Sequence, residues 1–195
     1  MPTNGGRMMD PIIISKIVLV DDGGFNLHEF GSGKPARGMY YTKFCQYLAK
    51  QFPKADNIVL ILGDGYYTYK KTENSLNHSQ SKKINFPKSL TDTDTVDELI
   101  NSVVGEIENC KNTLFFIDNR LSIEDTDINN GMLATALINE VINKNGYAIR
   151  YTSFPDYLET SIANKNYLGC VKQLSIHSPS IAAKAFALHI KREGD

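Results

Sequence analysis

Apolar residues gather in runs along this chain, and each run ends at polar or acidic residues. The runs at residues 12–20, 57–62 and 114–117 are rich in β-branched and aromatic residues and read as buried strands. Shorter runs at residues 147–151 and 170–176 predict two further strands. The chain is therefore expected to contain five strands.

Between these strands, apolar residues recur three to four positions apart, which is typical of helices that pack one face on a core. The predicted helices cover residues 39–52, 95–107, 132–142 and 155–163, with a last helix starting at Ser178. Thr95 and Glu98 form a capping-box pattern at the start of the second helix. Regular strand–helix alternation predicts an α/β fold, with a five-stranded parallel sheet and helices on both faces.

The remaining segments set the domain organisation. The 195 residues, 42% of them hydrophobic, suit one domain with a single core. Residues 1–11 read as a flexible lead-in, and residues 12–195 as the domain. Residues 68–93 are polar, rich in lysine and without periodicity, which predicts a long exposed insertion.

Composition narrows the choice of partners and compartment. The net charge of -1 gives the whole surface no attraction for nucleic acid or anionic membrane. No apolar run approaches the roughly 20 residues that span a bilayer, and no signal peptide pattern is present. Three widely spaced cysteines, Cys45, Cys110 and Cys170, are expected to be reduced, buried thiols. We therefore expect a cytoplasmic protein that binds neither nucleic acid nor membrane.

The candidate chemistry lies where strands end. Asp21 and Asp22 follow the first strand, and Asp118 follows the run at 114–117. Ligands of open α/β sheets bind outside the carboxyl ends of the strands, so these carboxylates are the leading candidates for a functional site. The GSGK sequence at residues 31–34 is not a phosphate-binding P-loop, because Pro35 stands where Ser or Thr is required.

Several segments match one family in the right order. KIVLVDD resembles a first strand with its acidic pair, and FFIDNRLSIED followed by NNGMLATALI resembles a third strand, its aspartate and a Gly-led helix. IRYTSF resembles a fourth strand, and SIHSPSIAAKAF resembles the start of a fifth helix. Over about residues 15–192 the chain resembles the receiver domain of bacterial two-component response regulators. The resemblance implies a flavodoxin-like sheet with strand order 2-1-3-4-5.

The resemblance also implies a chemistry. Asp118 would be the phosphoacceptor, and Mg²⁺ would be held by Asp21, Asp22, Asp118 and the backbone carbonyl of Arg120. The hydroxyl of Thr152 would hydrogen-bond the new phosphoryl oxygen and switch its loop. The implied partners are a sensor histidine kinase or phosphotransfer protein and a downstream protein, with a homodimer left open. The module would be no enzyme beyond weak autophosphorylation or autodephosphorylation.

Two family positions differ. The family's lysine at the end of the fifth strand falls here on Ile176 or His177, with Lys172 too far back along the strand unless the strand pairing has slipped. A protonated His177 is the substitute we assign to the site. The family's aromatic switch residue is replaced by Gln173 or Leu174. Two versions therefore stay open: a phosphorylated receiver, and a pseudo-receiver that acts through protein binding.

Other interpretations compete with this one. The alternative enzyme is a metal-dependent phosphohydrolase using the same carboxylates, although such enzymes commonly carry D-x-D where this chain has adjacent acids. A third possibility is an interaction module that binds its partner through residues 68–93. In the plainest interpretation, Asp21 and Asp22 form a solvated turn and Thr152 caps a helix.

Overall fold

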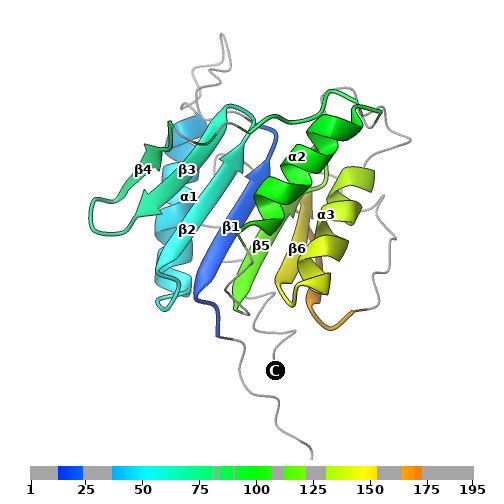
Figure 1. Ribbon diagram of the computed structural model, residues 1–195. Helices are drawn as coiled ribbons and strands as arrows, with labels where there is room; N and C mark the ends of the chain where they lie inside the picture. The colour runs from blue at the N-terminus through cyan, green and yellow to red at the C-terminus, as the bar shows by residue number, and fades with distance from the viewer. Residues whose placement is uncertain are drawn as a thin grey trace, which may run out of the picture.

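The computed structural model describes residues 13–23, 37–80, 82, 84–89, 91–106, 112–121, 131–152 and 164–172. A central sheet with helices on both of its faces makes up this part of the chain (Figure 1). The elements in chain order are β1 Lys16–Asp21, α1 Arg37–Gln51, β2 Asn57–Leu62, β3 Gly65–Lys70, β4 Ser75–His78, α2 Thr93–Val104, β5 Thr113–Asp118, α3 Met132–Asn143, β6 Tyr147–Thr152 and β7 Tyr167–Lys172.

The sheet has seven strands in the order β4-β3-β2-β1-β5-β6-β7. From β2 to β7 every neighbouring pair is parallel, whereas β2–β3 and β3–β4 are antiparallel. The predicted α/β class with helices on both faces is confirmed. The predicted five-stranded, all-parallel sheet is wrong, because an antiparallel hairpin extends it beyond β2.

The hairpin covers residues 65–78 and so overlaps the first part of the stretch 68–93, which the sequence analysis assigned to a polar insertion. Glycines on both sides of Asp64 reverse the chain after β2, and Gly65 has a φ of 152° that side chains rarely adopt. Tyr66, Tyr67 and Tyr69 then supply aromatic residues that pack on both faces of the sheet. The sequence concealed this hairpin because residues 70–78, which complete β3 and form the turn and β4, contain a single apolar residue, Leu76.

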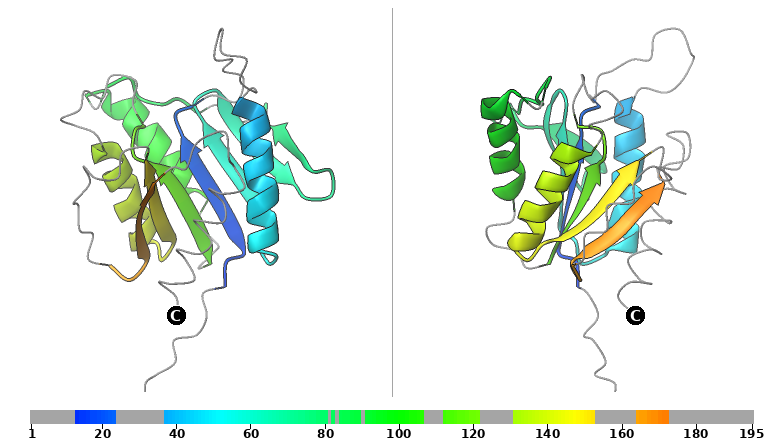
Figure 2. Two further views of the ribbon diagram at one scale, coloured as in Figure 1. Left: turned by 180° about the vertical axis from the view of Figure 1, so that it is seen from behind. Right: turned by 90° about the vertical axis from the view of Figure 1, so that its right-hand side faces the viewer.

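Helices cover both faces of the sheet (Figure 2). An apolar layer lies between the sheet and the helices on each face. On β1, Ile17 and Leu19 face the layer that contains α1, whereas Val18 and Val20 face the layer that contains α2 and α3. A strand covered on both faces needs apolar residues at every position, which explains the unbroken runs in the sequence. The acids at the ends of these runs therefore follow strands that are packed on both faces.

The first three predicted helices are present, and their ends show local causes. α2 begins at Thr93, where Asp92 caps it by accepting a hydrogen bond from the Thr95 amide at 3.3 Å. The capping box predicted for Thr95 and Glu98 is thus wrong, since Asp92 supplies the cap three residues earlier. After α3 the chain turns at Asn145, whose φ of 63° lies in the left-handed region.

The last strand differs from its prediction. It pairs in parallel with β6 and spans Tyr167–Lys172, so it begins three residues before the predicted start at 170, and residues 173–176 of the prediction lie outside the described residues. Gly169, with φ of 98°, lies at a register shift in this pairing, and Leu168 is buried in the core beside it. The predicted helices at residues 155–163 and from Ser178, and the lead-in at 1–11, lie outside the described residues.

The sequence analysis also made predictions about the cysteines and about membrane-spanning helices. Cys45 is buried as predicted, Cys170 is only partly buried, and Cys110 lies outside the described residues. None of the helices in the described part of the chain is both long enough and apolar enough to span a lipid bilayer.

Candidate functional site

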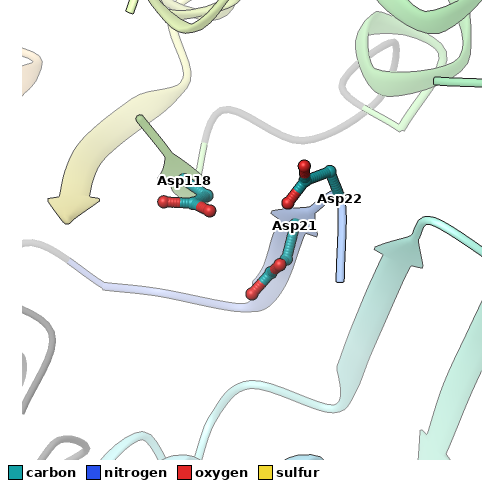
Figure 3. A group of neighbouring side chains, drawn as sticks. All are labelled: Asp21, Asp22 and Asp118. Carbon is teal, nitrogen blue, oxygen red and sulfur yellow. The ribbon is translucent and has the colours of Figure 1, made fainter. Parts of the chain in front are cut away.

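Three carboxylates converge where β1 and β5 end. The two strands pair in parallel with Val20 beside Ile117, so Asp21 and Asp118 leave the sheet side by side. Asp21, Asp22 and Asp118 each offer an oxygen within 4.8 Å of the others (Figure 3). The structure thus brings together the three acids that the sequence analysis selected, from positions almost 100 residues apart.

Both oxygens of the Asp21 carboxylate are already held by the protein. Oδ1 accepts a hydrogen bond of 2.7 Å from the backbone amide of Gly23. Oδ2 accepts one of 2.9 Å from the phenol hydroxyl of Tyr151 on β6. Asp21 and Tyr151 are both buried, at 7% and 3% exposure. The orientation of this carboxylate is therefore fixed on two sides.

The electrostatics of Asp118 reflect crowding of like charge. Burial raises the pKa of Asp118 well above its usual value, and the negative charges of Asp21 and Asp22 raise it further. Backbone hydrogen bonds from Arg120 and Asn119 act in the opposite direction and lower the pKa. A cation among the three carboxylates would relieve this repulsion and favour the ionised form of Asp118.

Tyr151 remains a hydrogen-bond donor in this environment. Complete burial raises the pKa of its phenol well above 10, and the nearby charges of Asp21 and Asp118 add to the increase. An ionised carboxylate can only accept hydrogen bonds, so the Tyr151 hydroxyl must donate to Asp21.

Gly63, in the turn after β2, allows the backbone at Asp22 and Gly23 to lie close to the end of β2. A Cβ placed on Gly63, directly after β2, would lie 2.0 Å from the carbonyl oxygen of Asp22. The amide of Gly63 also donates to the carbonyl of Gly23 at 3.3 Å. The ends of β1 and β2 can therefore meet this closely only with glycine at position 63.

On the side of α3, the segment after Asp118 packs against the start of that helix. The Asn119 amide donates to the Tyr151 carbonyl at 3.0 Å, which ties the end of β5 to β6. A Cβ on Gly131, whose φ is 93°, would lie 2.4 Å from Oδ1 of Asn119. Arg150, buried beside them, donates through Nη2 to the Thr135 hydroxyl. These contacts hold β5, β6 and α3 together beneath the acids.

The other predicted site residues have different outcomes. Thr152 is the last residue of β6, so its backbone lies at the same edge as the acids. Arg120 is exposed two residues beyond Asp118, where its carbonyl was expected to complete a metal shell. His177 lies outside the described residues.

Two residues that the sequence analysis did not assign to the site also lie at this edge. The sheet register sets Lys172 beside Thr152, one step beyond the pairing of Tyr151 with Val171. A slipped pairing was the condition under which Lys172 could reach the site, and the β6–β7 pairing does contain a register shift. The placement of the family's lysine position on Ile176 or His177 stays a prediction, because these residues lie outside the described part of the chain. The signal was available, because the run from Tyr167 to Val171 ends at this lysine. Tyr151 carried no comparable signal, since its contact with Asp21 depends on three strands lying side by side.

Comparison of the chain with protein-family models finds no matching family, and comparison with curated proteins finds no match either. We therefore infer the function of the chain from the residues and geometry at this edge of the sheet.

Proposed function

We propose that this chain is a receiver-like signalling module that binds Mg²⁺ among Asp21, Asp22 and Asp118 and accepts a phosphoryl group on Asp118. The observation that carries the proposal is the convergence of these three carboxylates at the carboxyl edge of a parallel strand pair. Such an edge is where open α/β folds bind ligands. The burial and crowding that raise the pKa of Asp118 are further features of functional sites.

The donor set fits a small hard cation. Mg²⁺ prefers oxygen ligands at about 2.1 Å in an octahedron, so two of its ligands lie about 3 Å apart when adjacent and about 4.2 Å apart when opposite. Carboxylate oxygens within 4.8 Å of one another approach that spacing with only a small inward movement. The backbone carbonyl of Arg120 would be a further ligand, with waters completing the shell.

Bound Mg²⁺ would supply positive charge that offsets the charge of a transferring phosphoryl group. An oxygen of Asp118 would form the new bond to phosphorus as the phosphorus–nitrogen bond of a phosphohistidine breaks. The electron pair of that bond stays on the imidazole nitrogen. The donor would thus be a sensor histidine kinase or a phosphotransfer protein.

Two residues beside Asp118 would recognise the product. Thr152 would donate its hydroxyl to a phosphoryl oxygen, and Lys172 would pair with the added negative charge. The support for Lys172 is its backbone register beside Thr152. With a lysine at this position, a protonated His177 is no longer required for the proposal.

Titration with Mg²⁺ followed by beryllofluoride, a phosphoryl analogue, tests the proposal on the full chain. Backbone NMR signals of Asp21, Asp118 and Thr152 are expected to shift with Mg²⁺ and again with beryllofluoride. Asp118→Asn should abolish the second shift, because it removes the nucleophilic carboxylate oxygen.

The other outcomes separate the alternatives. Binding of Mg²⁺ without any beryllofluoride response would favour a pseudo-receiver that acts through protein binding. Steady turnover of a generic phosphate ester, lost in Asp118→Asn, would instead favour a metal-dependent phosphohydrolase. Absence of any response to millimolar Mg²⁺ would contradict the metal site itself.

A further inference from the structure

The phenol of Tyr151 occupies an unusual place for a core tyrosine. It lies on the α1 side of the sheet, yet its hydroxyl reaches across β5 to β1 and meets the Asp21 carboxylate. β5 separates β6 from β1, and Asp118 at its end pairs in register with Tyr151. A buried tyrosine usually satisfies its hydroxyl wherever it can, but here the partner is one of three converging acids.

The geometry points to Tyr151 as a positioning residue that orients Asp21 for a small divalent cation and disfavours a larger one. This inference rests on the proposed metal site and adds a determinant of ion selectivity to it. Asp21 accepts one hydrogen bond on each oxygen, from Gly23 and from Tyr151. Each oxygen therefore keeps lone-pair capacity for an ion, while rotation of the carboxylate is blocked.

Selectivity follows from the different demands of the two ions. Mg²⁺ requires near-ideal octahedral geometry and takes carboxylates through single oxygens, whereas Ca²⁺ tolerates flexible shells of 6–8 oxygens and often binds both oxygens of one carboxylate. A carboxylate locked by two donors suits the first ion. A carboxylate freed at Oδ2 could rotate to offer both oxygens, which suits the second.

The carbonyl oxygen of Val20 is a second possible acceptor for the Tyr151 hydroxyl. The hydroxyl oxygen lies 3.4 Å from the Val20 carbonyl and 2.9 Å from Oδ2 of Asp21. The hydroxyl has one hydrogen, and a hydrogen bond to an ionised acceptor at the shorter distance is the stronger of the two. The hydrogen bond to Asp21 is therefore the main role of this hydroxyl.

The test compares Mg²⁺ and Ca²⁺ affinities of the wild-type chain and Tyr151→Phe by isothermal titration calorimetry. We expect the variant to bind Mg²⁺ about 10-fold more weakly, as is typical when a group supporting a metal ligand is removed. Its Ca²⁺ affinity should fall by less, so the preference for Mg²⁺ decreases. Tyr147→Phe is the matched control, since it removes a hydroxyl from the same face of β6 at the opposite end of the strand.

The outcomes distinguish this inference from the proposed function. A wild-type chain that binds neither ion overturns both. Wild-type binding with unchanged Mg²⁺ affinity in Tyr151→Phe, or equal losses for the two ions, overturns the positioning role alone. If the variant does not fold, the Tyr151 Cζ resonance of the wild-type chain provides the readout. It should move on Mg²⁺ binding, and an unmoved resonance would refute the inference.

Discussion

At the scale of single residues, the site combines a destabilising and a stabilising arrangement. Asp118 lies near two like charges in a half-buried position, and its pKa is raised well above the usual value. Asp21, beside it, has a donor on each carboxylate oxygen. Hydrogen bonds therefore fix the carboxylate of Asp21, whereas ionised Asp118 is destabilised by the negative charges of its two neighbours. A cation or a phosphoryl group on Asp118 would change that balance.

The raised pKa of Asp118 predicts how the stability of the metal-free protein depends on pH. A carboxyl whose folded-state pKa is raised stabilises the fold below its unfolded-state pKa, and this contribution is lost as pH rises through the folded-state pKa. Thermal unfolding of the wild-type chain in the presence of a chelator should therefore show a melting temperature that falls as the pH rises from the unfolded-state pKa of Asp118 to its folded-state pKa.

Asp118→Asn should remove this part of the fall, because the amide carries no charge. Above the folded-state pKa we expect the variant to melt a few degrees higher, since about 1 kcal/mol corresponds to roughly 2–4 °C in a chain of this size. Identical pH profiles for the two proteins would contradict the crowded ionised state. Added Mg²⁺ should stabilise the wild-type chain more than the variant.

At the scale of elements, the loops after β1 and β2 depend on each other. Asp22 can stand beside Asp21 and Asp118 only because the turn after β2 presents glycine to its carbonyl. The same turn leads into the β3–β4 hairpin that extends the sheet. The close approach of the Gly63 backbone to that of Asp22 therefore contributes both to the start of the hairpin and to the position of the acids.

Gly63→Ala tests this coupling. The new methyl group would lie 2.0 Å from the Asp22 carbonyl, so the backbone of the acid loop must move. We expect a loss of about 1–3 kcal/mol in the free energy of unfolding, which is typical of an overpacked site, together with weaker Mg²⁺ binding. Urea unfolding and Mg²⁺ titration measure the two effects.

Gly105→Ala provides the comparison for this variant. Gly105 ends α2 with ordinary helical φ and ψ, and its added Cβ would lie 3.1 Å from the Asn101 carbonyl. It should change stability less than Gly63→Ala and leave Mg²⁺ affinity unchanged. Equal Mg²⁺ affinity in both variants would show that the close approach at Gly63 does not position Asp22.

At the scale of the whole molecule, the order of strands decides which residues share the functional edge. β1 lies between β2 and β5, and β6 and β7 follow beyond β5. In this arrangement Asp118 pairs with Tyr151, and Tyr151 pairs with Val171. One residue further along, Thr152 pairs with Lys172. Residues from both halves of the chain therefore meet along one edge.

Lys172→Ala tests whether this edge recognises a phosphoryl group. The variant should bind Mg²⁺ as the wild-type chain does, because the lysine supplies no oxygen ligand. Its NMR response to beryllofluoride should weaken at least 10-fold in apparent affinity, since a charge-assisted hydrogen bond contributes about 1.5–3 kcal/mol. Lys165→Ala, in the turn before β7, serves as the control. An undiminished response in Lys172→Ala would exclude the lysine from the site.

The sequence by itself determined the buried strands, the first three helices and the three acids. Strands covered on both faces require unbroken apolar runs, and an acid that directly follows such a run must emerge at the sheet edge. Asp21, Asp22 and Asp118 were predictable for that local reason. The bounds of β7 were less so, because Gly169 interrupts its pattern with a backbone conformation that only pairing with β6 explains.

Only the tertiary structure decided how these parts meet. The hairpin was hidden because residues 70–78 contain a single apolar residue, Leu76, whereas the tyrosine rings of β3 pack on both faces of the sheet. Lys172 gained its place from a register shift, and Tyr151 from the lateral order of three strands. Hydrogen bonds between distant residues depend on which strands become neighbours. Periodicity along one strand carries no information about that choice.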